Sequence, residues 1–306
     1  MVDGVKIPYA GWQQQMTGCA PSVAQALLPY PQFCSSLTGV NENLGSSTYH
    51  SLQLKAERRY AQSLYLLATY THSKLLTDVG GNTQSGAGAW NGQTGVISPF
   101  ERKRNKALAA DDVPNVFSLA MVYQLPFGKG KHFMNSGGFV DKIFGGWETS
   151  LNYRASSGTP LFFRSGTCNV PGQFRVACIP SLAGSSPFAQ SKGSYDPTKP
   201  LYSKSAFEPV TDFNFFYGKG PRITNYRGFA YTNLDFVLVK NISLTERLKL
   251  QIRGEAFNAL NEHHFTCAGF AGCSPFNNDI SSADFGTWNG SVTTPRNVQL
   301  VGRITF

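Results

Sequence analysis

Apolar and polar residues alternate along several segments of this chain, so that every second side chain is apolar. The clearest case is 248–256, where leucine and isoleucine alternate with lysine, glutamine, arginine and glutamate. Successive side chains of a β-strand point to opposite faces, so this spacing predicts strands with one apolar and one polar face. The pattern predicts seven strands, near residues 48–57, 63–74, 115–125, 146–157, 232–242, 247–258 and 297–306.

The connections between these predicted strands alternate between shorter and longer. The turn 58–62, the Gly- and Lys-rich link that begins at Pro126 and the link 243–246 are shorter, whereas the segments 77–112, 158–230 and 259–295 are longer. Outer-membrane barrels combine short periplasmic turns with longer extracellular loops, and their strands need about 9–11 residues to cross a bilayer. We therefore predict an all-β fold, an antiparallel transmembrane β-barrel segment of about seven strands with long extracellular loops.

Continuing the same alternation backward makes residues 1–47 a further outer loop and leaves the C-terminus on the periplasmic side. A soluble β-sandwich shows the same alternation within its strands. Long loops without structure inside a compact soluble domain count against that alternative.

Composition supports a strand-rich protein with an apolar face. Aromatic residues make up 13% of the chain, and charged residues only 15%, compared with roughly 25% in typical soluble domains. The net charge of +9 raises the question of nucleic acid. The densest basic run, 101–106, lies in a polar stretch without a nucleic-acid-binding motif. We interpret it as a solvated loop, with anionic lipid headgroups or polysaccharide as the alternative contact, and expect no nucleic acid partner.

The six cysteines all lie in the expected outer segments, two in each of three segments. This distribution favours local disulfides that stiffen exposed loops in an oxidising compartment. Metal binding is the competing interpretation, but no C-x-x-C motif occurs and His263-His264 near Cys267 lacks the usual zinc spacing. We expect no metal. The favoured pairs are Cys19–Cys34, Cys168–Cys178 and Cys267–Cys273.

No motif points to catalysis or to a cofactor, so we expect neither. Asp235, Glu255 and Arg253 fall on predicted polar faces and would form a catalytic group on one interpretation. In a barrel wall such residues more often line a water-filled lumen or contact a plug, and we interpret them as lumen-facing charges. The aromatic residues Tyr70, Tyr123, Trp147 and Tyr153 fall on the apolar faces, as lipid-contacting residues do.

Several short motifs resemble the C-terminal barrel of Oar-like TonB-dependent receptors, which carry a carboxypeptidase-regulatory-like domain at the N-terminus. The resemblance runs from Ile7 to Phe306, and it rests on the order and spacing of the motifs together. They are Leu52-Gln53-Leu54-Lys55-Ala56-Glu57-Arg58-Arg59, Tyr70-Thr71-His72-Ser73-Lys74, Tyr123-Gln124-Leu125-Pro126-Phe127-Gly128-Lys129-Gly130, Gly145-Gly146-Trp147, Ser157-Gly158-Thr159-Pro160, Leu244-Thr245-Glu246-Arg247 and Glu255-Ala256-Phe257-Asn258-Ala259-Leu260-Asn261.

The resemblance implies a wall of about 22 strands around a plug that an inner-membrane motor pulls through TonB. It also implies that the final strand, with Leu300, Gly302, Ile304 and the terminal Phe306, is a signal for the barrel-assembly machinery. One position departs from the family, because Asn115 follows Asp112-Val113-Pro114 where a histidine is usual. We expect residues 1–306 to be the C-terminal part of such a barrel. The plug, the N-terminal domains and an export signal are then expected upstream.

Function follows as an expectation from this resemblance. We expect a bacterial outer-membrane protein that takes up a nutrient such as a carbohydrate or chelate, with lipid, lipopolysaccharide, the barrel-assembly machinery and the TonB complex as partners. Two alternatives stay open: a surface protein for adhesion or secretion that uses the barrel as a platform, and a secreted glycan-binding β-sandwich. Fold alone does not name a substrate.

Overall fold

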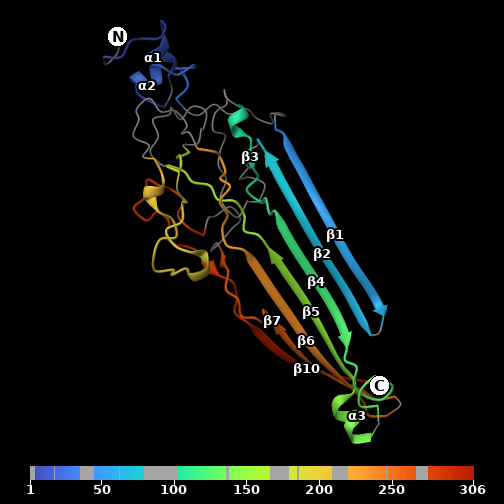
Figure 1. Ribbon diagram of the computed structural model, residues 1–306. Coiled ribbons are helices and arrows are strands. Elements are labelled where there is room, and N and C mark those ends of the chain that lie inside the picture. Colours follow the sequence, from blue (N-terminus) through green and yellow to red (C-terminus); the bar gives the residue numbers. More distant parts are fainter. Residues whose placement is uncertain are drawn as a thin grey trace.

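A computed structural model shows the chain as one long antiparallel sheet with large connections gathered at one end (Figure 1). It describes residues 4–16, 18–34, 45–61, 63–78, 102–135, 138–165, 179–184, 186–208, 220–245, 247–266 and 275–306. Within these residues, each long strand pairs with the next long strand in the chain. They are β1 (Ser47–Ala61), β2 (Leu64–Thr77), β4 (Asn115–Gln124), β5 (Trp147–Ser156), β6 (Tyr231–Ser243), β7 (Lys249–Phe257) and β10 (Asn297–Thr305).

The pairing register aligns the apolar positions of neighbouring strands on one face and the polar positions on the other. On the apolar face Tyr70 lies opposite Phe117, Leu119 opposite Tyr153, and Leu151 opposite Phe236. On the polar face Asn152 lies opposite Asp235, Glu255 opposite Gln299, and Gln251 opposite Arg303. A slip of one residue would put every side chain of a strand on the wrong face, so the sequence pattern fixes this register.

Large apolar side chains are exposed on the apolar face of the sheet, where contact with water would be unfavourable. Leu54 in β1 is 56% exposed and Leu300 in β10 is 82% exposed. Among the described residues no second sheet packs against this face, because the other sheet consists of the two-residue strands β8 (Phe265–Thr266) and β9 (Ser291–Val292). A sandwich needs two facing sheets. The described residues therefore form one large sheet without the facing sheet of a sandwich.

The two ends of the sheet differ as the alternation of connections predicts. The long segments between β2 and β4, between β5 and β6 and between β7 and β10 lie at the end where the N-terminus is found (Figure 1). The turn between β1 and β2, the helix α3 (Gly138–Phe144) and the C-terminus lie at the opposite end. We call these the loop end and the turn end. No helix in the described part of the chain is long and apolar enough to cross a membrane.

Several details differ from the sequence-based predictions. The predicted turn 58–62 is mostly strand, because β1 continues to Ala61 and pairs with β2 through an irregularity between Arg58 and Ala61. Short elements that alternation cannot reveal occur at the loop end. They are the helices α1 (Trp12–Gln15) and α2 (Val23–Ala26), the strand β3 (Ala107–Leu108), which pairs with β2, and the 3-10 helices Arg102–Asn105, Lys192–Ser194 and Lys204–Ala206.

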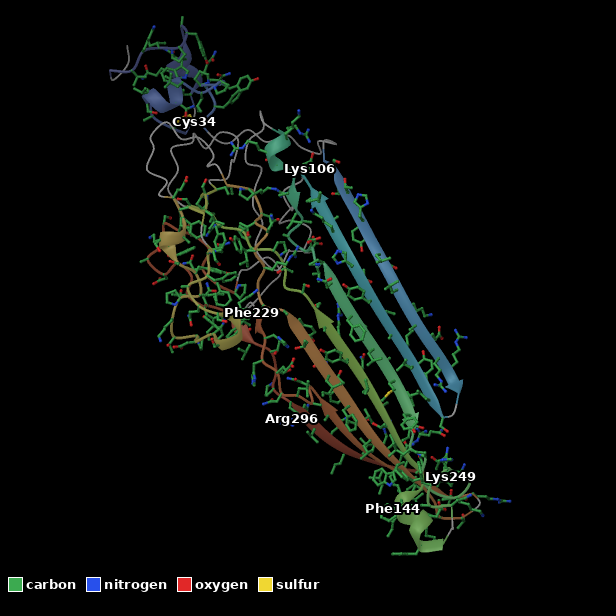
Figure 2. All side chains as sticks on the ribbon, viewed as in Figure 1. Cys34, Lys106, Phe144, Phe229, Lys249 and Arg296 are labelled. Atoms are coloured by element: carbon green, nitrogen blue, oxygen red, sulfur yellow. A yellow bond between two sulfur atoms is a disulfide. The ribbon has the colours of Figure 1, made fainter. Side chains whose placement is uncertain are left out.

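The main hydrophobic core lies among the connections at the loop end. A cluster of buried residues joins the segment between β5 and β6 to the segment between β7 and β10, and Figure 2 shows their crowded side chains near Phe229. We call this unit the cap. Its buried members are Leu161, Phe163, Leu201, Tyr202, Ala206, Phe207, Phe276, Ile280 and Phe285.

Candidate functional site

The polar face of β7 and β10 carries a charged network that includes two of the predicted residues. The Arg253 guanidinium lies 2.7 Å from a carboxylate oxygen of Glu255, and the side-chain amide of Gln299 donates to the other oxygen. Glu255 is only 8% exposed. A carboxylate at such a position requires charged or polar partners, and these two side chains provide them.

Asp235 lies on the same face but has its own partners. Its carboxylate accepts hydrogen bonds of 3.0 Å from the side chain of Asn233 and from the backbone N–H of Asn258. It lines a recess of about 570 Å³ together with Phe257, Asn258 and Arg296, among others. The structure thus joins Arg253 to Glu255 and leaves Asp235 outside their network. Residues 235, 253 and 255 share the polar face of the sheet.

A second charged network lies on the polar face of the edge strand β1. The Lys55 ammonium lies 2.7 Å from Glu57, and the Arg59 guanidinium lies 2.5 Å from the same carboxylate. Their spacing of two residues was visible in the sequence as part of a polar strand face. The sequence alone does not mark them as a group, because charged residues at alternate positions are ordinary on a solvated strand face.

The cap has a core of aromatic rings that come from distant parts of the chain. The ring of Phe163 lies 5.1 Å from that of Tyr202, 4.7 Å from that of Phe207 and 6.1 Å from that of Phe285. Such edge-to-face and tilted contacts are favourable beyond the area that they bury. Burial raises the pKa of the Tyr202 hydroxyl above its ordinary value. The cap is therefore a packed unit.

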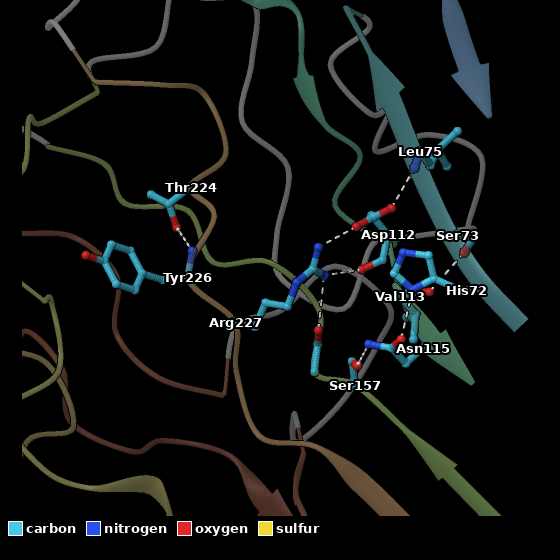
Figure 3. Close-up of polar contacts among 11 residues, drawn as sticks. His72, Ser73, Leu75, Asp112, Val113, Asn115, Ser157, Thr224, Tyr226 and Arg227 are labelled. Carbon is cyan, nitrogen blue, oxygen red and sulfur yellow. Dashed lines mark hydrogen bonds and ion pairs between the residues drawn. The ribbon is translucent and has the colours of Figure 1, made fainter. Parts of the chain in front are cut away.

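A buried ion pair holds the cap to the wall (Figure 3). Arg227 donates to the carboxylate of Asp112 at 2.5 Å, to the backbone carbonyl of Asp112 at 2.7 Å and to that of Gly158 at 3.2 Å. The other carboxylate oxygen of Asp112 accepts from the backbone N–H of Leu75 in β2 at 2.6 Å. The side chains of Asp112 and Arg227 are 1% and 21% exposed. We call this pair the Asp112–Arg227 clamp.

Beside the clamp, Asn115 connects three neighbouring strands, β2, β4 and β5. It accepts from the Tyr70 hydroxyl at 2.7 Å, lies 2.9 Å from a ring nitrogen of His72, and donates to Ser157 at 3.0 Å. Asn115 therefore links β2, β4 and β5 near the loop end of β4.

A second arginine, Arg222, joins the cap to the segment that precedes β3. It donates to the backbone carbonyls of Asn105 at 2.9 Å and Thr77 at 2.8 Å, and its burial lowers its pKa. The sequence predicts a solvated loop for the basic run 101–106. The basic side chains of Arg102, Lys103 and Lys106 are exposed, as in a solvated loop. Asn105 is buried, however, and its backbone carbonyl is the one that Arg222 contacts.

The structure contains the expected disulfide between Cys19 and Cys34. It closes a small unit around Trp12, which is fully buried and donates to the Pro31 carbonyl at 2.7 Å. The other four cysteines, Cys168, Cys178, Cys267 and Cys273, lie outside the described residues, so their pairing stays a prediction. Among the residues that are described, no three His, Cys, Asp or Glu side chains gather as metal ligands do.

The last strand presents the residues of the predicted assembly signal. Leu300 and Ile304 are exposed on the apolar face, and Gly302 lies between them on that face. Phe306 at the chain end is 97% exposed. Their role as an assembly signal stays a prediction.

A family model described as "Outer membrane beta barrel domain" matches residues 4–299. No curated protein and no solved structure matches the chain.

Proposed function

The chain belongs to the outer membrane beta barrel domain family, and from this premise we propose that it forms wall and extracellular loops of a TonB-dependent nutrient transporter. The family places the chain in the bacterial outer membrane, as an antiparallel β-barrel. The apolar face then meets lipid, and the polar face lines the lumen. The loop end with its cap is extracellular, and the turn end is periplasmic.

The observation that carries the proposal is the direction of the two edge strands. Because each long strand is antiparallel to the next, β1 and β10 run in the same direction. Bacterial barrels are antiparallel throughout and have an even number of strands. Closure therefore calls for an odd number of further strands, roughly 15 in a transporter of about 22 strands. In lipid, the backbone amides at the two edges of this sheet would have no hydrogen-bond partners. The free-energy cost is too high for the sheet to exist in the membrane without further strands.

The polar face supports a plugged lumen. Charged groups from β1 and β7 point to this side in networks that are held by hydrogen bonds. The interior of a large barrel is polar, and in transporters of this size it holds a plug. A plug domain that a TonB complex pulls on would supply a polar surface that meets these networks.

The cap supports capture of a solute outside the cell. Its aromatic core and the Asp112–Arg227 clamp hold together the described parts of the segments between β5 and β6 and between β7 and β10. Ordering before binding lowers the entropic cost of capture. We further propose lipid and lipopolysaccharide as neighbours of the wall, and the barrel-assembly machinery as the reader of Leu300, Ile304 and Phe306.

The test is nutrient uptake by cells with and without the intact gene. Both strains are given a defined mixture of oligosaccharides and metal chelates, and depletion of each compound is measured with and without a protonophore. We expect the disrupted strain to lose uptake of one compound class, and complementation to restore it. The restored uptake should require the proton-motive force.

The alternative function predicts a different result. If the disrupted strain takes up every compound normally but adheres to surfaces or exports a cargo less well, the barrel is a platform for adhesion or secretion. An immunoblot of outer membranes adds a size criterion. A transporter of about 22 strands with a plug gives a heat-modifiable band near three times the 33.4 kDa of this chain.

A further inference from the structure

The connection between β4 and β5 exposes apolar side chains at the turn end of the wall. Phe139 is 77% exposed, Phe133 52%, Phe144 47% and Ile143 45%. Figure 2 shows Phe144 on α3, at the far end of the molecule from the cap. Large apolar side chains gathered at one place on a surface indicate an interaction site. In a barrel, the turn end of the wall is surrounded by lipid and by the periplasm.

Hydrogen bonds hold the carboxyl end of α3 on the lipid side of the wall. Trp147 and Lys240 are cross-strand partners on the apolar face of β5 and β6. The indole N–H of Trp147 donates to the Ile143 carbonyl at 2.9 Å, and the Lys240 ammonium donates to the same carbonyl at 3.0 Å and to that of Gly145. Both side chains start from the apolar face. They therefore place the end of α3 beside the lipid.

The orientation of α3 follows from Asp141. Its carboxylate accepts from the backbone N–H of Lys129 at 2.6 Å, which turns this side of the helix toward the preceding segment. The approach is close, because a Cβ on Gly128 would lie 2.6 Å from the Gly145 Cα. Phe139 and Ile143 are four residues apart and lie on the side of α3 opposite Asp141. The apolar side of the helix thus faces away from the protein.

The charges around α3 complement a phospholipid surface. The segment 126–146 contains three lysines and one aspartate. The Asp141 carboxylate accepts from the backbone N–H of Lys129, and the Lys131 ammonium donates to Ser63 and Gln124 on the polar side of the wall. The side chains of Lys129 and Lys142 are exposed. Exposed ammonium groups that flank an apolar patch are typical of helices that lie in the interface of an anionic membrane.

We propose that α3 is an interfacial anchor that inserts into the phospholipid leaflet on the periplasmic side. Phe133, Phe139, Ile143 and Phe144 enter the boundary between headgroups and acyl chains, about 5–10 Å deep. The ammonium groups of Lys129 and Lys142 bind lipid phosphates. Lipid is the occupant because α3 continues the apolar face that the barrel presents to the bilayer. This inference rests on membership of the barrel family, and it holds whether or not the protein transports a nutrient.

The test measures the depth of α3 with a nitroxide at position 139. An encoded ketone amino acid carries the label, so that the native cysteines stay untouched. The full-length protein is reconstituted in vesicles of phosphatidylethanolamine and phosphatidylglycerol, and accessibility to oxygen and to a neutral nickel chelate is compared. Labels at Leu300 on the lipid face and at Thr198 in the cap are the controls. A heat-modifiable gel band shows that each variant is folded.

We expect position 139 to admit oxygen and to exclude nickel several-fold relative to Thr198, at a depth shallower than Leu300. A second label at Ile143 should behave alike, which guards against a local effect of the first. The paired substitution Lys129→Gln and Lys142→Gln should raise nickel access at 139. Nickel access at 139 and 143 equal to that at Thr198 would overturn the anchor. Unchanged depth in the lysine variant would overturn the phosphate contacts.

Discussion

Replacing Arg227 by alanine tests how the cap is fixed to the wall. The substitution removes the cation from the Asp112 carboxylate, whose side chain is 1% exposed. Breaking a buried ion pair costs about 3–5 kcal/mol, because the remaining charge stays buried without its partner. Arg227 itself is 21% exposed, so solvent moderates the loss and we take the lower end, about 3 kcal/mol. A loss of about 3 kcal/mol corresponds to an approximately 100-fold larger equilibrium constant for local opening of the cap.

Hydrogen exchange of the full-length protein in lipid nanodiscs measures this opening. The backbone N–H groups of Thr224 and Gly228 donate to Leu161 and Thr159, so their exchange reports on the clamped segment. We expect Arg227→Ala to speed their exchange by about 100-fold. Exchange in β5 should stay unchanged, because its ladder does not depend on the cap.

Arg164 provides a matched control, since it pairs with Asp279 at 3.6 Å in the same cap but is 63% exposed. Exposed pairs contribute about 0–1 kcal/mol, so Arg164→Ala should speed exchange by less than about 5-fold. Equal effects of the two arginine substitutions would refute the reasoning. A double variant of Asp112→Ala and Arg227→Ala should lose less than the sum of the two single variants. Additive losses would also contradict the clamp.

Three further predictions concern the wall, the core of the cap and the disulfide. Leu151→Arg, at the centre of the apolar face, should destabilise the barrel by about 2–4 kcal/mol, whereas Ser150→Arg on the polar face should leave it intact; urea unfolding in lipid vesicles compares the two. Phe163→Ala should cost the cap about 3–5 kcal/mol, seen as faster exchange across it while the strands keep their protection. Cys19→Ser opens a disulfide across 15 residues, so the segment 4–34 should lose about 3 kcal/mol of local stability; unchanged exchange there would contradict a stabilising role.

The strands could be predicted from the sequence because their cause is local. In 248–256 successive side chains face lipid and lumen in turn, and apolar and polar residues alternate accordingly. The alternation of connection lengths then predicted which ends of the strands lie together. Strand ends were less accurate, as at 58–62, because an irregularity in the pairing of β1 with β2 interrupts the alternation.

The cap and the clamp could not be predicted in this way because their contacts join distant residues. Asp112 and Arg227 are separated by 115 positions, and neither stands in a pattern that marks a pair. The core of the cap brings together the rings of Phe163, Tyr202 and Phe285, which lie far apart in the two long connections between β5 and β6 and between β7 and β10. The predicted charges Arg253 and Glu255 were found together because they belong to one strand face, whereas the separate partners of Asp235 depend on Asn258 at the end of β7.

The central claim is that one face of this sheet meets lipid and the other lines a lumen. A fluorophore scanned through positions 150–153 of β5, in outer-membrane vesicles, tests it directly. Labels at Leu151 and Tyr153 should be quenched by spin-labelled lipid and protected from aqueous iodide, with the reverse at Ser150 and Asn152. Quenching without this alternation, or iodide access at all four positions, would contradict the account.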